Sequence, residues 1–139
     1  MQDFFEYLNK SIDINDEAKS FISSVIKIRE FKKGNILITQ GQSKVIDTYF
    51  VLSGCLRSFM IDEDGKEHTV QFAIKDWWIS DYIAYYGKGE AILTVECLTD
   101  CIVLQSDKLS IEKVFENFPD IETFHRKNLE NSFVRLNKR

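Results

Sequence analysis

The residues best suited to contact a ligand lie in one aromatic stretch, DWWISDYIAYYGKG, which runs from Asp76 to Gly89. Side chains of tryptophan and tyrosine fill small cores, line pockets for uncharged or aromatic ligands, and anchor interfaces with partners. Core packing ranks first here, a ligand pocket second and an interface third. Trp77 and Trp78 are adjacent, so in extended backbone they must point to opposite faces of a strand.

Metal or redox chemistry has few candidate residues. The cysteines, Cys55, Cys97 and Cys101, form no ligand motif, and the only histidines are His68 and His125. Because the two histidines fall in different predicted elements, we expect neither a zinc site nor the histidine cluster of a metal-dependent cupin enzyme. We predict reduced cysteines, no metal, no cofactor and no enzymatic activity. A disulfide between Cys97 and Cys101 is the less favoured alternative.

Composition indicates one ordinary globular domain. The chain has 139 residues, is 44% hydrophobic and carries a net charge of −4, which argues against a large nucleic-acid surface. No apolar run approaches the ~20 residues that span a bilayer, and the start, MQDFFEYLNK, lacks the features of a signal peptide. We therefore expect a cytoplasmic protein with no membrane partner.

The elements that must position the aromatic stretch fall into three zones. The first zone, to about residue 27, is helical, with Asn15 as the expected N-cap of an amphipathic helix. The middle zone, residues 28–106, reads as short strands separated by turns, and Asp62–Gly65 is its strongest hairpin signal. In the strand after that hairpin, four side chains share one face: His68, Val70, Phe72 and Ile74.

The third zone is helical again. Ser106 is a plausible cap for the segment 107–118, and Pro119 suits the first position of a long helix that nothing interrupts before Arg139. The spacing of the strands indicates a mainly β fold of jelly-roll type with flanking helices. We divide the chain into a roll with its helices, residues 1–118, and a C-terminal helix, residues 119–139.

Three motifs accompany this order of elements: FKKGNILITQGQ (31–42), TYFVLSGCLRSFMIDEDGKEHTVQF (48–72) and SDKLSIEKVFENFPDI (106–121). Together with the order of elements, they resemble the cyclic nucleotide-binding domain of the Crp/Fnr family of bacterial transcription regulators. The resemblance implies a double-stranded β-helix that senses a small-molecule effector and forms a homodimer through the long helix. The dimerisation residues would be Ile121, Phe124, Leu129, Phe133 and Leu136.

The resemblance also implies that DNA is contacted only through a C-terminal winged helix-turn-helix, which this chain does not include. A stand-alone ligand-binding or scaffold domain without DNA binding is the alternative. The effector, the target promoter and the sign of regulation are not given by the sequence.

In nucleotide-binding members of that family, a short turn and helix hold the phosphate and ribose, and an arginine pairs with the phosphate. The corresponding segment here is ISDYIAYYGKGEAIL, with Ser80 and Asp81 at the glycine and acidic positions, and Ala91 and Ile92 where the arginine is expected. No arginine stands between Arg57 and Arg126. We therefore predict no tight binding of cyclic AMP or cyclic GMP. The candidate pocket residues are Trp78, Ser80, Asp81, Tyr82, Ala91 and Ile92.

Two other cations require a role. Arg57 is expected to pair with a carboxylate across the sheet, and Lys88 between two glycines is expected to be a solvated loop residue.

Overall fold

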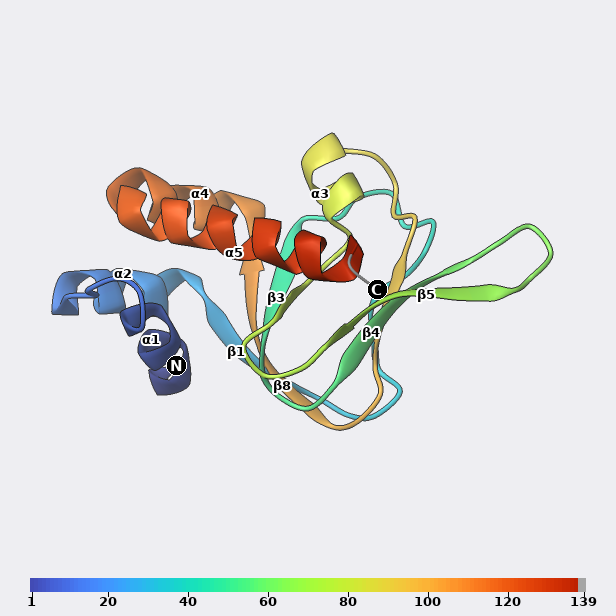
Figure 1. Cartoon of the computed structure of the whole chain (residues 1–139), viewed down its shortest axis with the longest axis horizontal. Coiled ribbons are helices and arrows are strands. Elements are labelled where there is room, and N and C mark those ends of the chain that lie inside the picture. The colour runs from blue at the N-terminus through green and yellow to red at the C-terminus, as the bar shows by residue number, and fades with distance from the viewer. Residues whose placement is uncertain (138–139) are drawn as a thin grey trace.

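The computed structural model describes the backbone of residues 1–137 and the side chains of residues 1–128. The chain order of helices, strands and helices is the predicted one, and Figure 1 shows the helices gathered beside the strands. The elements are α1 (Gln2–Asn9), α2 (Asp16–Val25), β1 (Lys27–Phe31), β2 (Ile36–Ile38), β3 (Asp47–Ser53), β4 (Leu56–Ile61), β5 (Glu67–Ala73), β6 (Trp78–Ile79), α3 (Tyr82–Gly87), β7 (Thr94–Cys97), β8 (Cys101–Asp107), α4 (Lys108–Asn117) and α5 (Pro119–Asn137).

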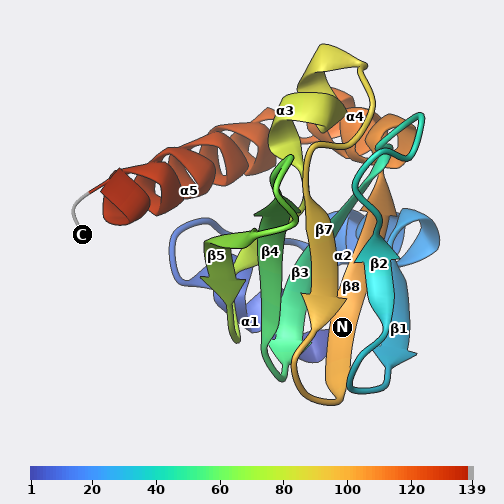
Figure 2. The ribbon, with the colours of Figure 1, turned by 90° about the vertical axis from the view of Figure 1, so that its right-hand side faces the viewer.

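The strands form two four-stranded antiparallel sheets, which confirms the predicted jelly roll (Figure 2). Sheet A has the order β1-β8-β3-β6, and sheet B has the order β2-β7-β4-β5. The Asp62–Gly65 segment makes the predicted turn between β4 and β5, because Gly65 adopts a φ of 81° and donates its N–H to the carbonyl of Asp62.

Sheet A separates two hydrophobic cores. The roll core lies between the sheets, and the helix core lies between sheet A and helices α1, α2, α4 and α5. Successive side chains of a strand point to opposite faces, so on β6 Trp78 enters the helix core and Ile79 enters the roll core. Trp77 packs against the roll core. The two tryptophans therefore face different surroundings, as their adjacency predicts.

Local rules account for most helix ends. Asn15 caps α2 by accepting the N–H of Ala18 at 2.8 Å, and Pro119 is the first residue of α5, as predicted. The predicted cap at Ser106 is wrong. Ser106 still pairs with β3 as part of β8, and Asp107 caps α4 by accepting the N–H of Ser110 at 2.8 Å.

The predicted common face of His68, Val70, Phe72 and Ile74 is wrong, because an irregularity in the register between β4 and β5 breaks the alternation. Phe72 pairs with Arg57 and His68 pairs with Met60, and those two partners lie on opposite faces of β4. Val70, Phe72 and Ile74 are all exposed, Phe72 at 48% of its surface, while Gln71 and Ala73 point inward. The inward Gln71 donates its side-chain N–H to the carbonyl of Trp78 at 3.1 Å. β5 is an edge strand of sheet B, so these exposed apolar side chains lie at the border of the roll.

Candidate ligand site

The predicted ligand segment forms a turn from β6 into α3, and Asp81 is its central residue. The Asp81 side chain caps α3 by accepting the N–H of Ala84 at 3.1 Å. Ser80, the residue before it, fixes the turn to β3 by donating its hydroxyl to the carbonyl of Asp47 at 2.7 Å. Both interactions place the Asp81 carboxylate in the interior of the roll.

The second oxygen of Asp81 reaches across to the strand segment that follows α3. It accepts the N–H of Ile92 at 2.7 Å and the N–H of Leu93 at 3.1 Å. These two amides converge on one point, which is the geometry that binds an anion. The anion in this structure is the chain's own carboxylate.

The site is closed to solvent at its centre. Asp81 is 0% exposed, Ala91 is 2% exposed, and Ser80 is also buried. Ala91 is fixed from both sides, since its N–H donates to the carbonyl of Gln42 and its carbonyl accepts the N–H of Gly41. A ligand at this position would have to displace the Asp81 carboxylate and separate α3 from the segment around Ala91.

The remaining candidate residues do not share one pocket with Asp81. Trp78 belongs to the helix core, where its ring lies 5.1 Å from that of Phe50. The hydroxyl of Tyr82 is 2.6 Å from that of Thr48, and Ile92 is exposed. The structure thus brings Ser80, Asp81 and Ala91 together. The side chains of Trp78, Tyr82 and Ile92 lie around this group and do not join it.

The structure also places Arg57 and Lys88, the two cations whose roles were predicted from the sequence. Arg57 pairs with Glu96 at 2.6 Å and with Glu67 at 3.0 Å on the outer face of sheet B, which confirms the predicted cross-sheet pair. The guanidinium also covers the Phe59 ring at 4.0 Å. Lys88 ends α3 and lines a surface cleft with Lys44 and Lys108. In the described residues, the three hydrogen bonds to the Asp81 carboxylate all come from backbone N–H groups.

Residues 28–118 match the cyclic nucleotide-binding domain family. The chain belongs to this family. No curated protein matches the sequence.

Solved structures share the fold of this cyclic nucleotide-binding domain at low identity. The Thermus thermophilus catabolite activator protein matches with a TM-score of 0.68 and 17% identity, over 89% of this chain and 59% of that one. The sensor domain of the Pseudomonas aeruginosa transcriptional regulator DNR gives 0.70 and 10%, over 88% of this chain and 81% of that one. The N-terminal domain of a Streptomyces coelicolor A3(2) transcriptional regulator gives 0.66 and 16%, over 90% and 88%. The chain therefore spans less than two thirds of the Thermus protein and most of the two isolated domains.

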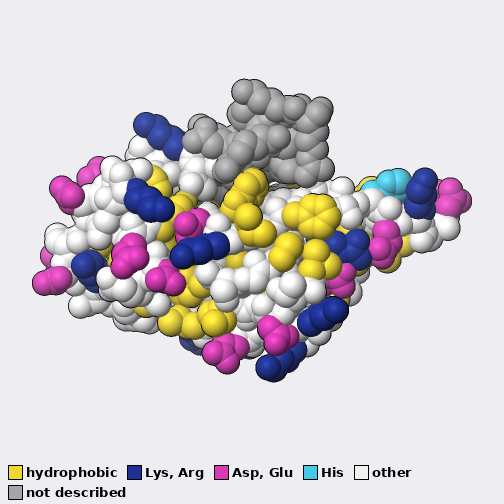
Figure 3. Space-filling model, turned by 60° about the horizontal axis from the view of Figure 1, so that its bottom comes forward, with side chains coloured by type: hydrophobic (Ala, Val, Ile, Leu, Met, Phe, Trp, Pro, Cys, Tyr) yellow, Lys and Arg dark blue, Asp and Glu magenta, His cyan; other side chains and the backbone are white. Residues whose placement is uncertain are grey.

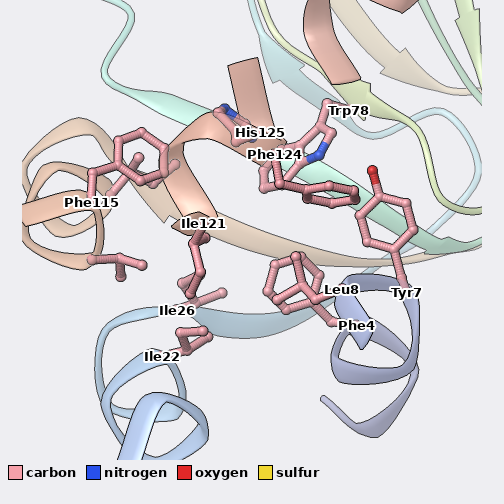
Figure 4. A pocket seen from close by; sticks show the side chains of 12 residues that line it. Phe4, Tyr7, Leu8, Ile22, Ile26, Trp78, Phe115, Ile121, Phe124 and His125 are labelled. Carbon is pink, nitrogen blue, oxygen red and sulfur yellow. The ribbon is translucent and has the colours of Figure 1, made fainter. Parts of the chain in front are cut away.

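The helix core of this domain holds a buried histidine beside a small cavity. Figure 4 shows His125 of α5 against Trp78, with α1 on the other side of the cavity. The His125 ring lies 4.6 Å from Trp78 and 5.4 Å from Phe115, and burial lowers its pKa to about 4. The unfilled volume is about 30 Å³ and almost entirely apolar. His125 is thus a buried residue that is neutral at ordinary pH.

The start of α5 packs on its own chain. Ile121 is buried in the helix core, and the Phe124 ring lies 5.4 Å from the ring of Tyr7 in α1. The other three residues of the predicted dimerisation stripe, Leu129, Phe133 and Leu136, lie outside the residues whose side chains are described.

The cysteines are free thiols that converge at one end of the roll. Cys97 and Cys101 are buried, and burial raises the pKa of Cys97 to about 12, with a smaller contribution from Cys101. Gly54 closes this end with a φ of 94°, and a Cβ there would lie 2.7 Å from the Cys101 sulfur. Within the described residues, no group of three or more His, Cys, Asp or Glu side chains is arranged to hold a metal ion. In the same part of the chain, none of the helices is both long and apolar enough to cross a bilayer.

Sequence reasoning missed what Asp81 binds. The two amides that it accepts belong to residues eleven and twelve positions later, and no local pattern signals a hydrogen bond over that separation. It also missed the cluster of Lys44, Lys88 and Lys108, which come from three separate segments.

Proposed function

We propose that this domain is the effector-sensing and dimerising part of a Crp/Fnr-type transcription regulator, and that it does not bind a cyclic nucleotide in the usual way. The family supports the first half, together with similar structures that are named as the sensor or N-terminal domains of transcriptional regulators. DNA would be contacted through a C-terminal domain outside this chain, in the cytoplasm. A catalytic role is not proposed.

The observation that carries the second half is the engagement of Asp81. A buried phosphodiester needs converging N–H donors and a cation, because an unpaired buried charge is costly. Here the donors of Ile92 and Leu93 are occupied by the Asp81 carboxylate. Ala91 offers a methyl group where the family resemblance implies an arginine. An incoming phosphate would therefore meet a carboxylate of like charge and gain no cation.

Calorimetry with the 139-residue chain tests this half directly. We expect no saturable heat with cyclic AMP or cyclic GMP up to about 1 mM, and no shift of the unfolding midpoint at that concentration. A dissociation constant in the low micromolar range for either nucleotide would refute the proposed loss of nucleotide binding.

Dimerisation through α5 is supported by the sequence pattern of its second half and by the surface of β5. Ile121 and Phe124 pack within their own chain, so we propose that Leu129, Phe133 and Leu136 supply most of the helix pairing. Figure 2 shows α5 projecting past the β5 side of the roll, and Val70 and Phe72 of β5 are exposed. Figure 3 shows one face of the molecule, on which hydrophobic side chains lie among scattered charges.

Sedimentation measurements test the dimer. We expect a dimer at tens of micromolar and at least a tenfold weaker association in the Phe133→Glu variant, because a charge would enter an apolar seam. Lys127→Glu, an exposed change on the same helix and outside the stripe of Leu129, Phe133 and Leu136, is the matched control and should leave association nearly unchanged. A monomeric wild-type chain at that concentration would contradict the proposal.

A further inference from the structure

A second surface cleft has a volume of about 500 Å³, and Asp81 is not among its lining residues. Its walls come from the loop before β3, the end of α3 and the start of α4. We call this the outer cleft. It is lined by Lys44, Val45, Ile46, Tyr85, Lys88, Asp107, Lys108 and Leu109.

The walls of the outer cleft are held in place by the backbone. The N–H of Lys108 donates to the carbonyl of Ile46 at 2.8 Å, which ties the loop to the start of α4. The Lys108 ammonium donates to the carbonyl of Tyr85 at 3.3 Å, which ties α4 to α3. The cleft is therefore a built feature of the fold, and its size falls in the range of about 300–1,000 Å³ that small-molecule pockets occupy.

Its surface is unusually apolar for an exposed region. Leu109 is 70% exposed, Tyr86 beside it is 56% exposed, and Ile46 is exposed to a similar degree. The Tyr86 ring packs edge-on against Tyr85 at 4.9 Å, so the rings present a rigid wall. Large apolar side chains held at a surface cleft mark a place where an apolar group is bound.

The charges around this wall are predominantly positive, although the chain as a whole carries −4. Three lysines line the cleft, and the Lys108 ammonium lies 5.6 Å and 5.9 Å from the ring centres of Tyr85 and Tyr86. Asp107 is the carboxylate among the lining residues, and both its oxygens accept hydrogen bonds from Ser110. Glu112, Asp107 and Asp47 also act electrostatically on Tyr85, so these carboxylates stand near the cleft as well.

Lys88 holds an unfavourable backbone conformation at the rim. Its φ is 59°, in the left-handed region that glycine adopts most cheaply, and glycines stand on both sides of it in the sequence. A helix end of this kind usually has glycine at that position. The lysine therefore retains a backbone cost that a glycine would remove, which indicates that its side chain contributes something in return.

We propose that the outer cleft binds an amphipathic carboxylate, a small molecule with an apolar body and one terminal carboxylate. The apolar body would lie against Leu109, Ile46 and the tyrosine wall, and the carboxylate would lie among the three ammonium groups. Lysine ammonium groups are compact point charges on flexible stems, so several of them can approach one carboxylate without fixing its orientation. This site is separate from the Asp81 position, and its occupancy does not depend on dimerisation or on DNA binding.

Octanoate is the probe, with 1-octanol as the matched uncharged ligand. In titrations followed by amide NMR on the whole chain, octanoate should give saturable shifts confined to residues around Ile46, Tyr85 and Leu109. It should bind at least about fivefold more tightly than octanol, and this preference should shrink in 0.5 M salt. Equal binding of the two ligands, shifts spread over the whole surface, or no saturation below about 10 mM would overturn the proposal.

Lys88→Gly is the decisive variant, because it removes one charge and relieves the backbone strain at the same time. It should weaken octanoate binding about three- to fivefold, leave octanol binding unchanged, and preserve or raise the unfolding midpoint. A loss of affinity therefore cannot come from unfolding. The charge control is Lys32→Gln, which removes one charge from an exposed lysine that does not line the outer cleft. Unchanged octanoate affinity in Lys88→Gly, or an equal loss in Lys32→Gln, would contradict the site.

Discussion

The roll core and the helix core lie on the two faces of the same sheet, and they are built differently. The roll core is mainly aliphatic, and its buried acid, Asp81, accepts three backbone N–H groups. The helix core is rich in aromatic rings, contains the neutral His125, and leaves about 30 Å³ unfilled. A closely packed core with satisfied polar groups resists rearrangement of its side chains, whereas a core with an unfilled cavity leaves them room to rearrange. The comparison indicates that the roll core is rigid and that the helix core, on which α5 packs, is more adjustable.

The largest effect should come from Asp81→Ala, which attacks the roll core at its polar centre. The change leaves one buried and two half-buried N–H groups without an acceptor, so we expect a loss of about 2 to 4 kcal/mol in the free energy of unfolding, measured by urea denaturation. Asp81→Asn keeps one acceptor oxygen and should cost less. Asp64→Ala, in the exposed turn, is the control and should change stability by less than about 0.5 kcal/mol. A loss below about 1 kcal/mol for Asp81→Ala would show that the carboxylate does not hold this core.

The second effect concerns acid and the helix core. His125 has a pKa of about 4 in the fold and an ordinary value of ~6.5 when unfolded, so between these values the unfolded chain binds a proton that the folded chain does not. Stability contributed by the neutral histidine is therefore present above pH ~6.5 and is lost as the pH falls to about 4. The full loss should be about 3 kcal/mol.

Unfolding measured at several pH values checks this prediction. His125→Phe should lose most of the pH dependence between about 6.5 and 4, while His68→Gln, at an exposed histidine paired with Asp62, should keep it. Comparing the two variants cancels the contributions of all other titrating groups. If wild type and His125→Phe lose stability in parallel on acidification, the helix core is not the acid-sensitive part.

Features governed by neighbouring residues could be predicted from the sequence. The Asn15 cap, the start of α5 at Pro119 and the turn that ends at Gly65 each follow from a local conformational rule, and each is present. The jelly roll followed from the number and spacing of such turns together with the family resemblance.

Features decided by distant partners could not be predicted. The predicted alternation of β5 fails because its register against β4 shifts between Gln71 and Thr69, and that shift is set by the pairing with β4 and not by the sequence of β5 alone. Ser106 and Asp107 are both good caps, and the choice between them is made by β3, whose ladder keeps Ser106 in the strand. The closed state of the candidate site likewise depends on a loop that brings Ile92 back to Asp81.

The smallest expected effect on the free energy of unfolding comes from making the same substitution, valine to isoleucine, in each of the two cores. Val114→Ile adds one methylene beside the cavity of the helix core, where there is room for it, so we expect a gain of up to about 1 kcal/mol. Val103→Ile adds the same group to the fully buried roll core, where neighbours must shift, so we expect a loss of about 1 to 3 kcal/mol. Urea denaturation of both variants measures the difference in sign.

The sign is the informative part of this pair, since both substitutions conserve polarity and β-branching. Because hydrophobic transfer favours the two changes equally, any difference between them must come from the space available at each site. If Val114→Ile were as destabilising as Val103→Ile, the helix core would be as tightly packed as the roll core. The helix core would then be no more adjustable than the roll core.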